Sequence, residues 1–138
     1  MAGSDTFSTY ITPTGLAAAD PNGICLTQTP GGAINLTING ALTAGGVGTL
    51  VPARNVTITS GGSSETGKTF TITGTATDGT AVTEAIAGPG GSATVSTTAL
   101  FETVTQVAVS GATSGAVTVG SGTTGNQAVF AGRTRLRG

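Results

Sequence analysis

The segment from Arg54 to Gly120 decides the fold, as in Thr69-Phe-Thr-Ile-Thr-Gly74 and Ala81-Val-Thr-Glu-Ala-Ile-Ala87. Apolar side chains stand at every second position of these runs, which is the period of a β-strand. The same pattern recurs in Asn55–Ser60, Val104–Ser110 and Ala116–Gly120. In most runs one face carries Val, Ile or Phe and the other carries Thr. The segment therefore predicts strands with one buried and one solvated face.

Composition points to a single folded domain built from strands. The chain has 138 residues, of which 8% are charged, a net charge of -1 and a mean hydropathy of +0.26, so it lacks the high charge and low hydropathy of disordered proteins. Its 24 glycines and many threonines argue against long helices, because both residue types are poor helix formers. The core must come from aliphatic residues, since Trp is absent and Tyr occurs once. We expect an all-β protein.

Within one domain spanning residues 1–138, the pattern distinguishes three parts. Residues 1–53 are irregular and contain several prolines, residues 54–120 hold the regular strands, and residues 121–138 hold a C-terminal strand and an arginine-rich arm. Further strands are predicted at Ile24–Gln28, Ala33–Asn39 and Gln127–Ala131, which brings the expected total to eight to ten. No fixed repeat period is visible, so a solenoid is not expected.

The turn at Thr77-Asp78-Gly79 can be interpreted in detail. A two-residue loop would place the apolar residues of the two flanking strands on opposite faces. A three-residue loop, with Gly79 in the left-handed conformation, gathers them on one face. We predict the second register. Its cross-strand pairs are Phe70 with Ile86, Ile72 with Glu84 and Gly74 with Val82.

The run Gly62-Ser-Ser-Glu-Thr-Gly-Lys68-Thr69 matches the nucleotide-binding pattern G-x-x-x-x-G-K-[ST]. That pattern binds phosphate only where the lysine and hydroxyl residues open a helix. Here a strand pattern follows the motif, and the strand before it is not fully apolar. We therefore interpret the match as a flexible hairpin loop without nucleotide chemistry.

Residue types limit the possible chemistry. With no histidine and one cysteine, the chain cannot use histidine-assisted nucleophilic catalysis or the usual zinc sites. Its six acidic residues are spread along the sequence, and no pair is marked as catalytic. We predict no catalytic residue, no metal site, no cofactor and no enzymatic activity. Cys25 lies between Ile24 and Leu26 and is expected to be a buried apolar residue.

Localisation and charge give further expectations. No signal peptide and no apolar run of membrane-spanning length is evident, so we expect synthesis in the cytoplasm and no membrane partner. Arg133, Arg135 and Arg137 supply three of the five basic residues. They are either a solvated tail or an arm that contacts an acidic protein surface through bidentate bonds. Nucleic-acid binding is not expected, because the net charge is slightly negative and aromatic residues are few.

Three stretches resemble a block common in small virion proteins of tailed bacteriophages, most of all their capsid cement, or decoration, proteins. They are Arg54–Ser60, Thr69–Gly88 and Phe101–Gly120, and the likeness covers about half of the chain. The resemblance implies an antiparallel β-sandwich, jelly-roll-like in connectivity. It implies a structural virion protein on the outside of the phage head, a homo-oligomer (dimer or trimer) that binds the major capsid protein and bridges neighbouring subunits. Arg133, Arg135 and Arg137 are then candidate partner-binding residues.

The main alternative is a host-surface or glycan-binding domain of a phage fibre or adhesin, because Thr- and Gly-rich strands also occur there. Such a domain should present a groove lined by aromatic residues. The chain contains four Phe and one Tyr. Five aromatic residues are too few for an aromatic-lined groove to be expected, so we expect the capsid role and not the fibre role.

Overall fold

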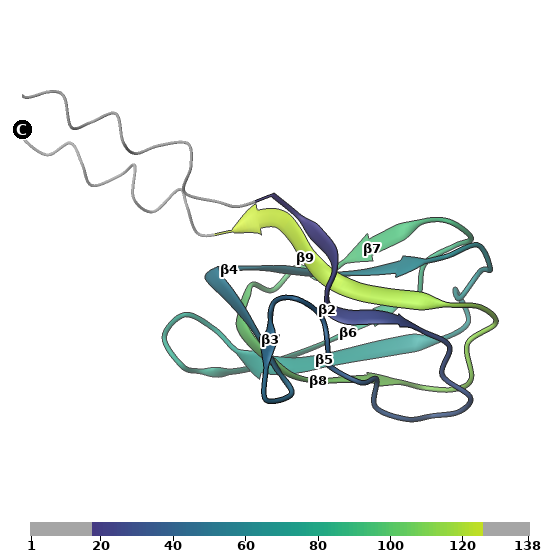
Figure 1. Cartoon of the computed structure of the whole chain (residues 1–138), viewed down its shortest axis with the longest axis horizontal. Coiled ribbons are helices and arrows are strands. Elements are labelled where there is room, and N and C mark those ends of the chain that lie inside the picture. Colours follow the sequence, from purple (N-terminus) through teal and green to yellow (C-terminus); the bar gives the residue numbers. More distant parts are fainter. Residues whose placement is uncertain (1–17, 126–138) are drawn as a thin grey trace, which may run out of the picture.

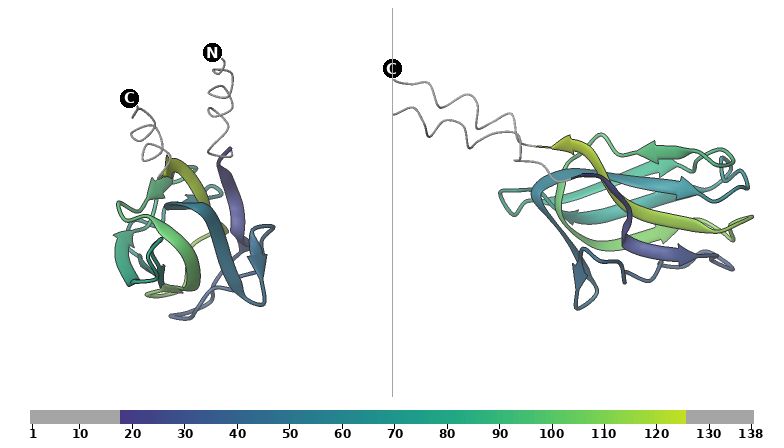
Figure 2. Two further views of the ribbon diagram at one scale, coloured as in Figure 1. Left: turned by 90° about the vertical axis from the view of Figure 1, so that its left-hand side faces the viewer. Right: turned by 45° about the horizontal axis from the view of Figure 1, so that its top comes forward.

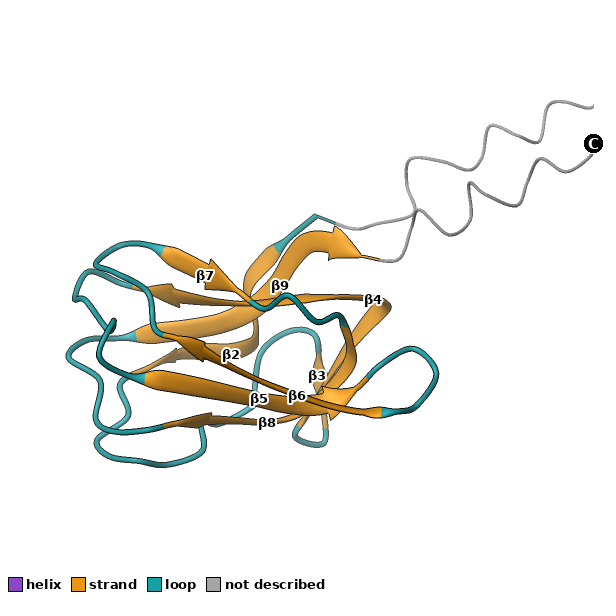
Figure 3. Cartoon of the chain, turned by 180° about the vertical axis from the view of Figure 1, so that it is seen from behind, coloured by secondary structure: helices purple, strands orange, loops and turns teal. Residues whose placement is uncertain are grey.

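The computed structural model describes residues 18–125, which form one antiparallel sheet of eight strands. The strands are β2 (Asp20–Gln28), β3 (Thr43–Ala44), β4 (Val47–Ser60), β5 (Thr69–Thr75), β6 (Ala81–Ala87), β7 (Thr94–Ser96), β8 (Phe101–Val109) and β9 (Val117–Gly125). The described residues contain no helix (Figure 3). The all-β class predicted from the strand period and the glycine content is confirmed.

The 14-residue strand β4 turns the sheet into two facing layers. Its first half pairs with β3 and β8, and its second half pairs with β9 on one side and β7 on the other. The pairing with β8 shifts register between Thr49 and Arg54, where β4 bends. In Figure 1 β9 and β7 consequently lie above β5 and β8, and the end-on view of Figure 2 shows the strands curving around the interior.

The core lies between these layers and is aliphatic with two phenylalanines. Its members come from β2, β4, β5, β8 and β9 together with Leu36. The fully enclosed side chains include Ile24, Val56, Ile58, Phe70, Ile72, Phe101, Val104, Val107 and Val119. Burial alternates along β5 and β6, as the period-2 pattern predicts, whereas β2 and β4 contain runs of consecutive buried residues. Burial of each such side chain contributes roughly 1.5–3 kcal/mol.

The predicted register of the β5–β6 hairpin is confirmed. Phe70 pairs with Ile86 and Gly74 pairs with Val82, and the ladder continues from Thr69 to Thr75 without a shift. Gly79 has a φ of 84°, and its N–H donates to the carbonyl of Ala76 at 2.9 Å. The left-handed glycine therefore closes the turn and sets which side chains share the inner face.

The inward-facing charge of β6 is held by backbone amides. Glu84 lies opposite Ile72 on the inner face of the hairpin. Its carboxylate accepts hydrogen bonds from the N–H groups of Thr98, at 2.9 and 3.0 Å, and Ala99, at 2.7 Å. These bonds replace hydration of the carboxylate. Glu84 thus links β6 to the connection between β7 and β8.

The predicted strand at Ala33–Asn39 is wrong. Only Asn35 forms a β-bridge, to Ala108 of β8. Leu36 is buried at 4% exposure whereas Ile34 is 49% exposed, so the alternating residues do not share one buried face. Side-chain bonds draw the rest of the segment toward β2: the Gln28 amide bonds both backbone groups of Thr37.

Three strands escaped the sequence pattern in whole or in part. β3 has two residues and β7 has three, too few for a period to show. β4 begins at Val47, runs through the cis Val51–Pro52 peptide and so crosses the limit at residue 53 that we expected for the regular strands. β4 belongs to both layers, so the strands form one continuous sheet and not two separate ones. The jelly-roll connectivity stays a prediction. The predicted strand at Gln127–Ala131 lies outside the described residues.

Candidate interaction surfaces

The glycine-lysine motif lies in the connection between β4 and β5. No helix follows it, because Thr69 begins β5. The connection is not the hairpin loop that the sequence suggested, since β4 and β5 do not pair with each other. It instead carries the chain from one layer to the other. A strand after the lysine leaves no helix N-terminus to hold phosphate.

Glu65 anchors this connection, which is therefore not a loosely held loop. Its side chain is buried, at 1% exposure, and its carboxylate accepts hydrogen bonds from the N–H of Ser114 at 2.9 Å and of Gly115 at 2.8 Å. The backbone is held as well: Glu65 N–H donates to Pro89 O at 2.7 Å, and Lys68 N–H donates to Glu65 O. The acidic residue of the motif thus has a structural role.

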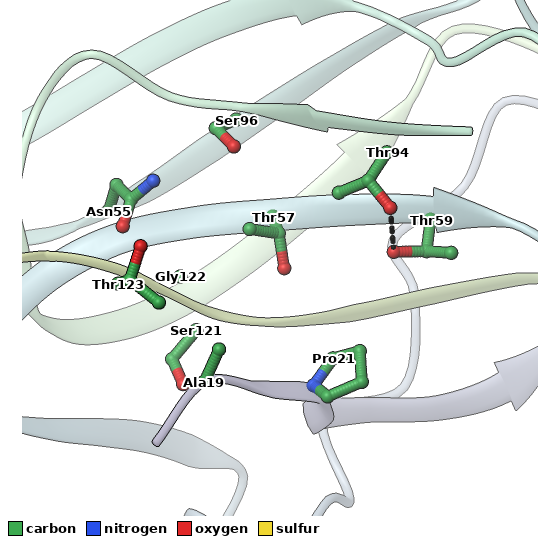
Figure 4. Close-up of a pocket in the computed structure, with 10 residues that line it drawn as sticks. All are labelled: Ala19, Pro21, Asn55, Thr57, Thr59, Thr94, Ser96, Ser121, Gly122 and Thr123. Carbon is green, nitrogen blue, oxygen red and sulfur yellow. Dashed lines mark hydrogen bonds between the residues drawn. The ribbon is translucent and has the colours of Figure 1, made fainter. Parts of the chain in front are cut away.

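An open groove of about 320 Å³ lies on the outer side of the layer that contains β7 and β9 (Figure 4). Its lining residues come from β4, β7, β9 and the start of β2. They are Ala19, Pro21, Asn55, Thr57, Thr59, Thr94, Ser96, Ser121, Gly122 and Thr123. We call this feature the hydroxyl groove, because six of the ten lining residues are Thr or Ser.

The lining of the hydroxyl groove offers hydrogen bonds. None of its lining residues is charged or aromatic. Four of its polar groups are already engaged: Thr59 Oγ1 and Thr94 Oγ1 lie 2.9 Å apart, Asn55 Oδ1 accepts from Thr124 N–H at 3.1 Å, and Ser121 Oγ accepts from Asp20 N–H at 3.2 Å. Uncharged hydroxyls can bond a partner's backbone or ordered water.

The outer side of β5 and β6 forms a second uncharged surface. We call it the threonine-alanine face, after its residues Thr69, Thr71, Thr73, Thr75, Ala81, Thr83, Ala85 and Ala87. All four β6 members are exposed, while those of β5 are exposed or half-buried. A sheet face without Lys, Arg, Asp or Glu can be covered by another protein without burying a charge.

Arg54 joins the two ends of the described chain. The side chain is buried at 4% exposure, and its Nη1 donates to Gly122 O at 3.0 Å, Ala18 O at 3.3 Å and Ser121 Oγ at 3.5 Å. Its Nε is buried without a partner. Because Asp20 also pairs with Ser121, the chain enters and leaves the body side by side (Figure 1).

Within residues 18–125, no three His, Cys, Asp or Glu side chains gather where they could hold a metal ion. This part of the chain likewise contains no helix able to cross a membrane. Cys25 is fully buried, and burial raises the pKa of its thiol to about 12. Its predicted role as a buried apolar residue is confirmed.

The predicted partner-binding residues Arg133, Arg135 and Arg137 lie outside the described residues. The charge is nevertheless divided unevenly along the chain. Residues 18–125 contain five acidic and two basic residues, a net of -3, whereas the two terminal segments contain one acidic and three basic residues, a net of +2; together these give the -1 of the whole chain. The terminal segments thus carry the charge opposite to that of the body.

No model of a protein family matches the chain, and neither the curated proteins nor the solved structures contain a significant match to it.

Sequence reasoning missed the roles of Arg54, Glu65 and Glu84. A signal existed for Arg54 and Glu84, because each is a rare charged residue inside an otherwise uncharged strand pattern. Only paired or hydrogen-bonded charges are tolerated in such places. The hydroxyl groove left no signal, since it depends on β7, on the bend of β4 and on the path of the chain before β2.

Proposed function

We propose that this chain is a structural, non-enzymatic protein of a phage virion. In this role it is a capsid cement, or decoration, protein that binds the outer surface of the head. The observation that carries the proposal is the arrangement of the body: its outer sheet surfaces present hydroxyl and methyl groups, and both chain ends leave it side by side at Arg54. The resemblance of residues 54–120 to decoration proteins supports the same role.

The surface chemistry suits a protein that is permanently covered. Burying an unpaired charge at an interface costs several kcal/mol, whereas a hydroxyl that finds a partner costs little. The hydroxyl groove and the threonine-alanine face contain no charged residue. Contacts of modest strength suffice on a shell, because many symmetric copies bind at once.

The terminal segments supply the directional part of the contact. Ala18 and Gly125, from which they extend, both lie at Arg54, so the two segments are proposed to contact the same region of a partner. Arg133, Arg135 and Arg137 give the C-terminal segment a charge suited to carboxylates of the major capsid protein. Copies that span capsid subunits add contacts that must break before the shell opens. The protein is made in the host cytoplasm and ends on the virion surface.

The test is binding to intact heads. Purified full-length protein should cosediment with heads that lack it, and heads that carry it should retain their DNA to a higher temperature. A variant truncated after Gly132 should keep the fold but bind more weakly. A matched variant with Arg133, Arg135 and Arg137 all replaced by Gln keeps the chain length. If the arginines pair with carboxylates, this variant should bind as weakly as the truncated one, and only wild-type binding should weaken with salt.

The fibre or adhesin alternative makes the opposite prediction. Its sugar ligand would stack on aromatic rings, and no lining residue of the hydroxyl groove is aromatic. Protein that ignores intact heads and binds host cells or a purified polysaccharide would replace the capsid proposal with this one.

A further inference from the structure

Strand β6 has an edge without a partner among the described residues. It is the last strand of the order β2-β9-β4-β8-β5-β6 and pairs only with β5. Two flanking bonds, from Ala76 N–H to Thr80 O and from Gly88 N–H to Lys68 O, fix which of its residues bond β5. Bonded residues alternate along an antiparallel pair. The outward backbone groups of β6 therefore belong to Ala81, Thr83, Ala85 and Ala87.

This edge lacks most of the features that usually prevent strand pairing. Natural edge strands carry lysine, proline, a bulge or an inward-pointing charge, or they are very short. β6 has seven residues without Lys or Pro, and its ladder with β5 has no register shift. Its one inward-pointing charge, Glu84, already accepts hydrogen bonds from the amides of Thr98 and Ala99 within the same chain, so a neighbouring strand would not have to desolvate it anew. The backbone groups of the edge therefore stay available to another strand.

The other edges of the described sheet are covered or short. Along β2, Asn39 and Gly40 N–H groups donate to Ile24 O, and Leu42 N–H donates to Gly23 O. The N–H of Leu26 is bonded by the Asn39 side chain. β7 has three residues and β3 has two. β6 is thus the one long edge of residues 18–125 that can accept a strand.

We propose that this edge pairs with β6 of a second copy of the chain, antiparallel and about a two-fold axis. The outward residues are Ala and Thr, so two copies meet with small, uncharged side chains on both sides. A two-fold contact uses the same edge on each copy and closes at a dimer. The covered β2 edge prevents continuation into a fibre. The inference stands independently of the proposed function.

Charge selects the register of the pair. A two-fold axis at Glu84 would set the two Glu84 residues opposite each other, which is unfavourable. An axis at Ala85 instead sets Glu84 opposite Ile86 of the second copy, and Thr83 opposite Ala87. In that register the two Ala85 residues form a hydrogen-bonded pair, with Cα atoms about 5.5 Å apart.

The contact should be weak in dilute solution. Seven residues of strand extend about 23 Å, and side chains as small as Ala and Thr bury little area. The interface is therefore below the roughly 800 Å² per partner of a tight complex. We expect monomers in dilute solution and dimers at high protein concentration or wherever copies are crowded together.

Sedimentation equilibrium of the full-length protein over a wide concentration range tests the association. Ala85→Lys places two lysines opposite each other at the axis and should weaken dimerisation at least about tenfold. Thr71→Lys is the matched control. Thr71 lies on β5 directly opposite Ala85, so this substitution adds the same charge one strand away from the edge. It should leave dimerisation nearly unchanged. Circular dichroism verifies that both variants fold.

Disulfide formation tests the register. Ala85→Cys should yield a covalent dimer under mild oxidation, because the distance between the two residue-85 Cα atoms in the proposed register suits a disulfide. Wild-type protein should not, since Cys25 is fully buried. Asp78→Cys, in the exposed turn, controls for random collision. Wild-type protein that stays monomeric at high concentration overturns the proposal. Dimers that persist in the Ala85→Lys variant would also overturn it. Equally fast disulfide formation by Asp78→Cys and Ala85→Cys would do so as well.

Discussion

Two glycine-containing connections flank β5, and both contain a carboxylate that accepts backbone hydrogen bonds. Before β5, Glu65 is buried and bonds the N–H groups of Ser114 and Gly115, about fifty residues away. After β5, Asp78 is exposed and bonds the N–H of Thr80, two residues away. One connection holds distant parts of the chain together, whereas the other shapes only its own turn.

The comparison shows that burial and sequence separation, and not residue type, determine the weight of such a bond. A buried amide that loses its acceptor cannot turn to water and costs about 1–3 kcal/mol. An exposed amide is rehydrated at once. The long-range bond also ties together residues about fifty positions apart, while the local bond forms within a turn.

The largest expected effect is the loss of the Glu65 carboxylate. Glu65→Ala leaves the amides of Ser114 and Gly115 without an acceptor and opens a cavity, so the free energy of unfolding should fall by about 3 kcal/mol. Urea unfolding followed by circular dichroism measures this change. Glu65→Gln keeps one acceptor oxygen and should lie between Ala and wild type.

Asp78→Ala is the control for that measurement. It should leave the urea midpoint close to the wild-type value, because its one bonded amide becomes exposed to water. Equal losses in the two alanine variants would show that burial does not separate the two connections. The comparison would then fail.

A glycine substitution should destabilise the exposed turn after β5 more than the connection before it. An added Cβ meets no atom within 4 Å at Gly67 or at Gly79, but Gly79 has a φ of 84°. Gly79→Ala should therefore lower the free energy of unfolding by about 1 kcal/mol. Gly67→Ala, the matched variant, should not lower it. Thermal unfolding measures both, and similar melting temperatures for the two variants would contradict the left-handed turn.

The local parts of the fold could be predicted from the sequence. The β5–β6 register follows from one turn, because the loop length and the position of Gly79 decide which side chains share a face. The strands β5, β6 and β8 and the second half of β4 follow from a period-2 pattern that each run carries by itself. Cys25 is buried for the same reason, as a small apolar residue inside a strand.

The non-local parts could not be predicted. The failed strand at Ala33–Asn39 has a strand pattern, but side-chain bonds from Gln28 and Asn39 direct its backbone along β2. The connection at Glu65 resembles a hairpin loop until the partners of β4 and β5 are known. The hydroxyl groove likewise depends on which strands become neighbours. Pairing partners are a property of the whole chain, not of any one segment.

A smaller effect is expected at Lys68, which ends the anchored connection. If Glu65 holds this segment and the lysine serves no ligand, Lys68→Ala should change stability by no more than about 0.5 kcal/mol. Calorimetry with ATP and magnesium should show no heat of binding to the wild-type protein. Micromolar ATP affinity that is lost in Lys68→Ala would give this connection a chemical role and reverse our interpretation of the motif.

The smallest effect is the pH dependence contributed by the exposed turn. The hydrogen bond from Thr80 N–H holds the pKa of Asp78 below its usual value of 3.8, so the charged form is favoured in the folded state. The resulting stability is present above about pH 4 and is lost as the pH falls through the lowered pKa. Asp78→Asn keeps an acceptor oxygen but does not titrate. The difference in urea midpoint between wild type and Asp78→Asn should therefore be small at pH 6 and should move in favour of the variant by pH 2.5. A difference that moves the other way, or a large one at pH 6, would mean that Asp78 contacts more than its own turn.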